Sequence, residues 1–262
     1  MTNEEYMQAV DMRCSRRTYK AKALDEATVS VIKDMVDYVN EKASLNFVYI
    51  EDMSFAFNIF SGKFGGIAVC GPDKILARED CGYYGETIVL QCVYHGLGTC
   101  WVSGTYNENK VLEYLNLPKG IRLYAVITVG YVKPEKSFKE KAMYKGTHKN
   151  SKPYQKMFEV CDEKIPSYVE SGMKSVEKAP SAVNRRPVKF RYENGVVSAS
   201  VDEPYSDKSI DFGIAKLHFQ LGCSAAGVKG EWINGSFLTE EQKILKFPKS
   251  NDNIEEEGGK NE

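Results

Sequence analysis

The chain has 262 residues, of which 42% are hydrophobic and 27% are charged, and these fractions are typical of a folded globular protein. The formal net charge of -1 argues against a general affinity for nucleic acid or for an anionic membrane surface. Because no apolar run approaches the roughly 20 residues of a membrane span, and no signal-peptide pattern opens the sequence, we expect a cytoplasmic protein.

In the first half, hydrophobic spacing predicts helices that alternate with short strands. The most apolar helix, at 76–96, leaves little polar face, so neighbouring elements must cover it nearly all round. Glycines at Gly96 and Gly98 end this helix. The other predicted elements are helices at 4–12, 25–41 and 107–115, and strands at 46–50, 54–60, 65–70, 99–103 and 123–132.

The second half begins with a polar, lysine-rich segment at 135–152, which we expect to link the two halves. Helices are predicted at 154–160, 162–176 and 209–221. Asn194-Gly195 separates strand-like runs at 188–192 and 196–201, and an Asn-Gly pair in this setting predicts a β-hairpin. The acidic end at 251–262 has nothing to bury and is predicted to be a disordered tail.

Two short matches indicate an internal repeat. Segment 41–46 recurs, with two residues inserted, at 177–184, an offset of 136 (177 minus 41). The Leu-Gly pair at 97–98, shortly before Cys100, recurs as Leu-Gly-Cys at 221–223, an offset of 124 (222 minus 98). Chance similarity is the alternative to duplication. A duplication divides the chain into a first unit at 1–134, a crossing segment at 135–160, a reduced second unit at 161–250 and the tail at 251–262.

A strongly cationic stretch, Arg-Cys-Ser-Arg-Arg, follows the first predicted helix at 13–17. Two guanidinium groups and a hydroxyl group at this spacing can hold a phosphate by charge-assisted hydrogen bonds. A solvated basic patch is the alternative. No GxGxxG follows a predicted strand and no GxxxxGK[ST] occurs, so neither a Rossmann dinucleotide site nor a P-loop is predicted.

A second stretch, Ala-Pro-Ser-Ala-Val-Asn-Arg-Arg-Pro at 179–187, has a proline near each end, which limits its backbone conformations. Ser181 and Asn184 offer donors and acceptors together, which suits the edge of a heterocycle with alternating C=O and N–H groups. A loop with a turn residue at each end is the alternative.

A third stretch, Gly-Leu-Gly-Thr-Cys-Trp-Val-Ser-Gly at 96–104, offers a tight turn and a glycine whose N–H a ligand can approach. Its alternative is a helix cap followed by a core strand. Seven cysteines without a CxxC pair and three scattered histidines predict reduced thiols and no metal site.

Together, in this order and with the repeat, the three stretches resemble the nitroreductase family of FMN-dependent oxidoreductases. They resemble in particular its fused branch, in which one chain carries two repeats and mimics the usual homodimer. The resemblance covers about residues 8 to 222. It implies an α+β nitroreductase-like fold, with two diverged repeats forming a pseudo-dimer whose antiparallel central sheets are flanked by helices.

The resemblance also implies roles for individual residues in binding FMN. Arg13 and Ser15 would hold the phosphate and the ribityl chain, Arg17 would lie by the N1 and C2 carbonyl edge, and Gly104 would present its N–H near N5. A cation beside N1 stabilises the reduced, anionic flavin.

In most of the family the Pro-Ser-x-x-Asn segment comes from the other subunit, whereas here Pro180, Ser181 and Asn184 would come from the second unit. The basic pair that follows the central strand in the family corresponds to Lys149 and Lys152, with Ser151 at one expected basic position.

By this resemblance the protein reduces a small nitroaromatic or quinone-like acceptor with NADH or NADPH, and the flavin, with no side-chain nucleophile, carries out the catalysis. A flavin-binding storage or sensor protein is the alternative, as are flavin fragmentation and reductive dehalogenation on the same fold. We expect a monomer whose partners are small molecules, without nucleic acid or membrane.

Overall fold

The computed structural model describes residues 1–149, 151 and 153–246. The predicted tail at 251–262 and the predicted ligand Lys152 lie outside the described residues. In the described part of the chain, every helix is too short or too polar to cross a membrane.

The first unit is a four-stranded antiparallel sheet with the strand order β1-β2-β4-β3. Two long helices cover one face of this sheet and bury its aliphatic side chains, while aromatic side chains fill the other face. Its elements are α2 (Glu26–Ala43), β1 (Val48–Ile50), β2 (Gly65–Pro72), α3 (Ile75–Tyr94), β3 (Leu97–Val102), α4 (Glu108–Leu115) and β4 (Ile121–Tyr131), with α1 (Asn3–Met12) before them and the 3-10 turn η1 (Ser54–Ala56) after β1.

The second unit has the same succession of helix, two strands, helix and two strands, with no counterpart of α4. Its sheet has the order β5-β6-β7-β9-β8, and without the parallel edge strand β5 the connectivity and antiparallel pairing equal those of the first sheet. Its elements are β5 (Phe158–Val160), α6 (Ser167–Lys178), β6 (Lys189–Glu193), β7 (Val196–Ser200), α7 (Lys208–Ala225), β8 (Gly230–Ile233), β9 (Ser236–Thr239) and α8 (Glu240–Lys246), with the 3-10 turns η2 (Tyr154–Lys156) and η3 (Ala182–Asn184).

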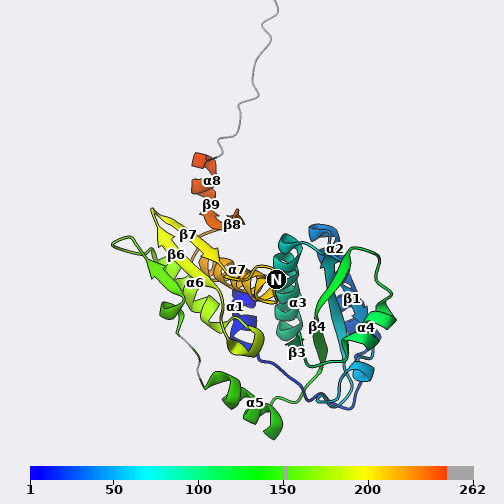
Figure 1. Cartoon of the computed structure of the whole chain (residues 1–262). Coiled ribbons are helices and arrows are strands. Elements are labelled where there is room, and N and C mark those ends of the chain that lie inside the picture. Colours follow the sequence, from blue (N-terminus) through cyan, green and yellow to red (C-terminus); the bar gives the residue numbers. More distant parts are fainter. Residues whose placement is uncertain (150, 152, 247–262) are drawn as a thin grey trace, which may run out of the picture.

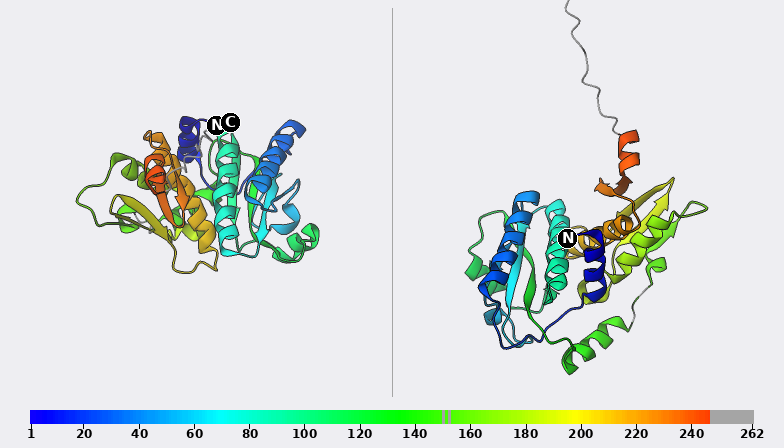
Figure 2. Two further views of the ribbon diagram at one scale, coloured as in Figure 1. Left: turned by 90° about the horizontal axis from the view of Figure 1, so that it is seen from above. Right: turned by 180° about the vertical axis from the view of Figure 1, so that it is seen from behind.

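The two units meet through α3 and α7, which lie side by side at the centre of the molecule (Figures 1 and 2). Glycines permit the close crossing: a Cβ at Gly82 would fall on the Ile210 carbonyl, and a Cβ at Gly213 on the Glu79 carbonyl. Both the pair of glycines and the pair of carbonyl residues are 131 positions apart (213 minus 82 and 210 minus 79). The contact is therefore reciprocal: Gly82 of α3 meets Ile210 of α7, and Gly213 of α7 meets Glu79 of α3. Contacts of this kind are typical of an interface with two-fold symmetry.

Of the two sequence matches, only one fits this symmetry. Segment 41–46 begins at the end of α2, the helix before β1, and segment 177–184 begins at the end of α6, the helix before β6. The Leu-Gly match is wrong, because Leu97 and Gly98 open β3 whereas Leu221 and Gly222 lie inside α7.

The described structure confirms most of the predicted elements, corrects two and adds four that were not predicted: β8, β9, α8 and a helix in the crossing segment. The predicted strand at 54–60 is η1 and a loop, whose Phe57 and Phe60 pack edge to face at 4.7 Å in the aromatic cluster. The predicted helix at 154–160 is η2 followed by β5. The crossing segment contains a helix that the sequence analysis missed, α5 (Phe138–His148), which begins with a capping box between Ser137 and Glu140.

Candidate functional site

The cationic stretch at 13–17 runs along the free edge of β3, the last strand of the first sheet. Ser15 forms a parallel bridge with Thr99, and the Arg16 N–H donates to the Thr99 carbonyl at 2.8 Å. The edge strand is thereby covered, and the arginines are held at a fixed register on the sheet.

The central arginine of the stretch has a structural role. Arg16 is buried and donates from Nε to Glu140 Oε1 at 3.3 Å, and the same oxygen accepts the N–H groups of Arg17 at 2.7 Å and Thr18 at 3.1 Å. Burial raises the pKa of Glu140, but these N–H groups, that of Ser137 and the Arg16 charge outweigh it, so the pKa lies below its ordinary value. The bonds to α5 fix the backbone at Arg17, one of the predicted flavin ligands.

Arg13 connects the first unit to the second. Its Nη2 donates to the Lys178 carbonyl at 3.2 Å, one residue before the Ala-Pro-Ser stretch. Its Nε lies 3.6 Å from Glu86 Oε1, within reach of an ion pair, but is buried without a hydrogen bond. The structure therefore brings Arg13 and Lys178, just before Ala179-Pro180, together, although 165 positions separate them in the sequence (178 minus 13).

The Pro-Ser-x-x-Asn stretch is a compact loop in which the predicted ligands bond within the protein. Ser181 Oγ accepts the Arg186 N–H at 3.0 Å. Asn184 Nδ2 donates to the Thr147 carbonyl at 3.2 Å and to Ser151 Oγ at 2.7 Å. The loop thus packs on the end of α5, beside the exposed Lys149 that ends the same helix.

The same loop is conformationally strained. Val183, Asn184 and Arg186 all adopt positive φ, at 45°, 57° and 48°. For a β-branched residue such as Val183, which is 78% exposed, this region is costly, and such strain is found mainly where surrounding contacts or a function require it.

A buried carboxylate of α7 holds the loop in place. Asp211 accepts the Ala182 N–H at 3.1 Å and the Arg185 Nε–H at 3.2 Å. Burial raises the pKa of Asp211 to about 6, against the opposing effect of these two partners.

This pKa predicts a pH-dependent stability. Because the folded-state pKa lies above the ordinary 3.8, the folded protein retains a proton that the unfolded chain releases. The free energy of unfolding should therefore fall as pH rises from 3.8 through about 6, by on the order of 3 kcal/mol. Urea unfolding of the wild type and of Asp211→Asn at several pH values in this interval measures the difference in slope. Asp207→Asn removes another partner of Arg185 that is 42% exposed, and it should keep most of the wild-type slope, because the Asp207 charge makes only a minor contribution to the raised pKa of Asp211. Equal slopes in the wild type and Asp211→Asn would contradict the assignment.

Cationic groups gather where this loop, Arg13 and α5 meet. Burial lowers the pKa of His148, and the charges of Arg186, Lys136 and Arg13 lower it further, against a hydrogen bond to the Tyr144 carbonyl. The Tyr144 ring stacks on His148 at 3.8 Å, and Lys136 lies over the Tyr144 ring. A phosphate fits this donor set, because Arg13, Lys136 and Arg186 all bring positive charge to it.

The last predicted ligand, Gly104, lies two residues beyond β3 in an exposed turn. Open space surrounds the position where a Cβ would stand, so a planar ring can approach its N–H.

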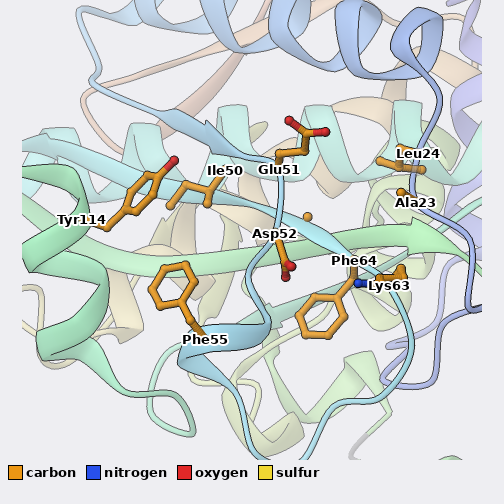
Figure 3. Close-up of a pocket in the computed structure, with 10 residues that line it drawn as sticks. Ala23, Leu24, Ile50, Glu51, Asp52, Phe55, Lys63, Phe64 and Tyr114 are labelled. Carbon is orange, nitrogen blue, oxygen red and sulfur yellow. The ribbon is translucent and has the colours of Figure 1, made fainter.

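Two hollows of the structure lie elsewhere. One, of about 410 Å³, is lined by single residues of β1, η1 and α4 and mainly by loop residues, among them Glu51, Asp52 and Lys63 (Figure 3). The second, of about 300 Å³, includes Cys14 and Arg16 but not Arg13. Neither is formed by the predicted ligands.

A buried polar cluster behind Arg13 escaped the sequence analysis. Glu86 of α3 and His218 of α7 are fully buried, with Nε2 of the histidine 3.0 Å from Oε1 of the glutamate. Trp101 of β3 donates its indole N–H to Glu86 Oε2 at 2.7 Å. The sequence does place a glutamate and a histidine in two helices that are otherwise almost entirely apolar, and such residues need a buried polar partner.

Comparisons with known proteins agree on the class. The family model described as "Putative TM nitroreductase" matches residues 5–223. A curated protein of Archaeoglobus fulgidus, named "Putative NADH dehydrogenase/NAD(P)H nitroreductase", is 25% identical over 158 residues, which cover 52% of this chain and 91% of that protein.

One solved structure shows the same fold. The crystal structure of a "putative nitroreductase" from Thermotoga maritima is similar with a TM-score of 0.61 at 18% identity, over 91% of this chain and 94% of that one. An "FMN-dependent Nitroreductase" from Clostridium difficile is matched at 18% identity and a TM-score of 0.41, over 50% of this chain and 90% of that one.

Proposed function

Because the chain belongs to the nitroreductase family, through the model described as "Putative TM nitroreductase", we propose that it is an FMN-dependent oxidoreductase that reduces a small acceptor with NADH or NADPH. The contact of Arg13 with the carbonyl that precedes Ala179-Pro180 carries this proposal, because it joins the cationic stretch to the heterocycle-reading loop. The name of the Archaeoglobus fulgidus relative supports the nicotinamide donor.

In this proposal each segment has a task in binding. Arg13 and Ser15 hold the phosphate end, with Lys149 and Lys152 adding positive charge from the segment after α5. Arg17, whose backbone α5 fixes, places a cation by the pyrimidine edge, and Gly104 offers its N–H from open space. Pro180, Ser181 and Asn184 close the site from the second unit. When bound, FMN supplies hydride acceptance and electron transfer, which no side chain provides.

We propose further that the chain is a fused pseudo-dimer and acts as a monomer, with units near 1–134 and 161–250 joined by the segment 135–160. The equal strand order of the two sheets and the reciprocal glycine contacts of α3 and α7 support this. So does the Archaeoglobus fulgidus relative, since about half of this chain spans nearly all of it. Sedimentation of the purified chain as a dimer that loses FMN on dilution would contradict the proposal.

The visible spectrum of the purified protein tests the cofactor directly. We expect flavin absorbance that persists through gel filtration, at one FMN per chain, because the cationic stretch occurs once. Anaerobic mixing with NADH or NADPH should then bleach the flavin. Absence of flavin absorbance, before and after addition of FMN, would contradict the proposal.

A flavin-binding store or sensor is the second candidate. The hydrogen bonds of Ser181 and Asn184 within the protein favour it, since these groups are already engaged without a ligand. The same anaerobic experiment separates the two candidates, because a store or sensor would bind FMN and remain oxidised on mixing with either nicotinamide.

A further inference from the structure

The polar cluster of Glu86 and His218 lies at the centre of the α3–α7 contact, where both side chains are 0% exposed. His218 Nδ1 lies 3.2 Å from the Ser175 carbonyl of α6, and Nε2 lies 3.0 Å from Glu86 Oε1. The charged groups that face this histidine, among the described residues, are Glu86 and Arg13.

The hydrogen-bond partners determine where the protons are. A carbonyl only accepts, so His218 Nδ1 carries a proton. Trp101 donates its indole N–H to Glu86 Oε2, and the Arg13 guanidinium lies near Oε1, with Nε at 3.6 Å; the carboxylate form of Glu86 suits both neighbours. With Glu86 ionised, Oε1 only accepts, and His218 Nε2 then also carries a proton. The arrangement expected at this site is a buried imidazolium paired with a buried carboxylate.

We propose that His218 is a positioning residue: through the Glu86 carboxylate it fixes the direction of the Arg13 guanidinium and so prepares the phosphate end of the flavin site. Glu86 faces Arg13 Nε, while the Lys178 carbonyl holds Nη2. Two helices of the second unit thus reach Arg13 of the first: α6 through the Lys178 carbonyl, and α7 through His218 and Glu86. This inference rests on the proposed FMN site for its functional consequence, but the orientation of Arg13 can be measured without FMN.

The direction in which Glu86→Gln changes the affinity for FMN shows whether Glu86 orients Arg13 or acts only through its charge. If Glu86 acted only as a nearby negative charge, Glu86→Gln would tighten binding of an anion. If Glu86 orients Arg13, the same substitution weakens FMN roughly tenfold or more, the range for loss of one charge-assisted contact between Arg13 and the phosphate. Glu79→Gln is the matched control, because Glu79 forms another α3–α7 ion pair, with Lys216 at 2.6 Å, two turns earlier.

Nitrogen-15 NMR of the flavin-free protein tests the proton assignment and the orientation. Both ring nitrogens of His218 should be protonated at neutral pH, and the Arg13 Nε–H should give a single, slowly exchanging signal. That signal should be lost in Glu86→Gln and His218→Leu and retained in Glu79→Gln. His218→Gln should restore it, because its amide can donate to Glu86.

Each alternative result is decisive. A His218 ring with one proton, an unchanged Arg13 signal in Glu86→Gln, or tighter FMN binding by that variant would overturn the inference. If the wild type binds no FMN, the proposed function fails, but the Arg13 signal still decides whether the cluster positions Arg13. If the variants do not fold, the protonation of the His218 ring in the wild type decides: two protonated ring nitrogens support the inference and one overturns it.

Discussion

Arg13→Ala weakens FMN binding roughly tenfold or more, because loss of one charge-assisted contact costs about 1.5–3 kcal/mol. Arg13→Lys should recover only part of the loss, since an ammonium group keeps the charge but cannot form the guanidinium fork. Flavin fluorescence quenching in a titration measures both. Arg122→Ala, which removes an exposed arginine that pairs with Asp73, should leave the affinity unchanged.

The site is shared between the units only if substitutions in the second unit have the same effect. Asn184→Ala should weaken FMN by a similar factor, because it removes the contacts that hold the loop on the end of α5 as well as the amide itself. Ser181→Ala tests the loop separately, since it removes the acceptor of the Arg186 N–H. Unchanged FMN affinity in both variants would mean that the first unit binds FMN alone.

Gly82→Ala and Gly213→Ala are each expected to lower the free energy of unfolding by about 3 kcal/mol or more, because the new methyl group would overlap a backbone carbonyl that cannot rotate away. Urea unfolding followed by circular dichroism measures the loss. Since both helices belong to one chain, the midpoint should not depend on protein concentration, as it would for two separate subunits.

The control for this prediction is another helical glycine. Gly146 lies in α5 with open space at its Cβ position, so Gly146→Ala should leave stability unchanged or raise it by about 0.5–1 kcal/mol. If Gly82→Ala and Gly213→Ala are as mild as Gly146→Ala, the helices do not cross as closely as the structure shows.

The sequence predicted elements whose signal is local. The helix that became α3 has an apolar surface with almost no polar interruption, and the Asn194-Gly195 hairpin has turn residues that adopt positive φ readily. The same turn signal at Asn234-Gly235 correctly marks the β8–β9 hairpin, which the sequence analysis did not use.

Elements that depend on distant partners could not be predicted in this way. β5 forms because it pairs in parallel with β6, about 30 residues later in the chain. The residues at 154–160 alone do not indicate this pairing. The aromatic residues at 54–60 favour a strand by propensity, but tertiary packing places Phe57 and Phe60 in a cluster instead.

The candidate site could likewise be predicted only in part from the sequence. Residue type was enough to single out Arg13, Ser181 and Asn184, because charge and hydrogen-bonding capacity can be seen in the sequence. Which of the three arginines at 13, 16 and 17 is structural could not be seen, since Glu140 selects Arg16 only in the folded chain. Glu86 and His218 were missed because their meaning arises from a contact between residues 132 positions apart (218 minus 86).

The reciprocal crossing of α3 and α7 has a consequence for how such a protein changes over generations. In a homodimer, one codon alters both copies of an interface residue, so every substitution must suit both. Here Gly82 and Gly213 are separate codons, and the residues around them already differ: Glu86 on α3 has its counterpart, 131 positions on, in Leu217 of α7. A charge acceptable in one helix need not be tolerated in the other. If the two units arose by duplication, as proposed above, one unit could therefore keep the cationic stretch while the other lost it and retained only the loop.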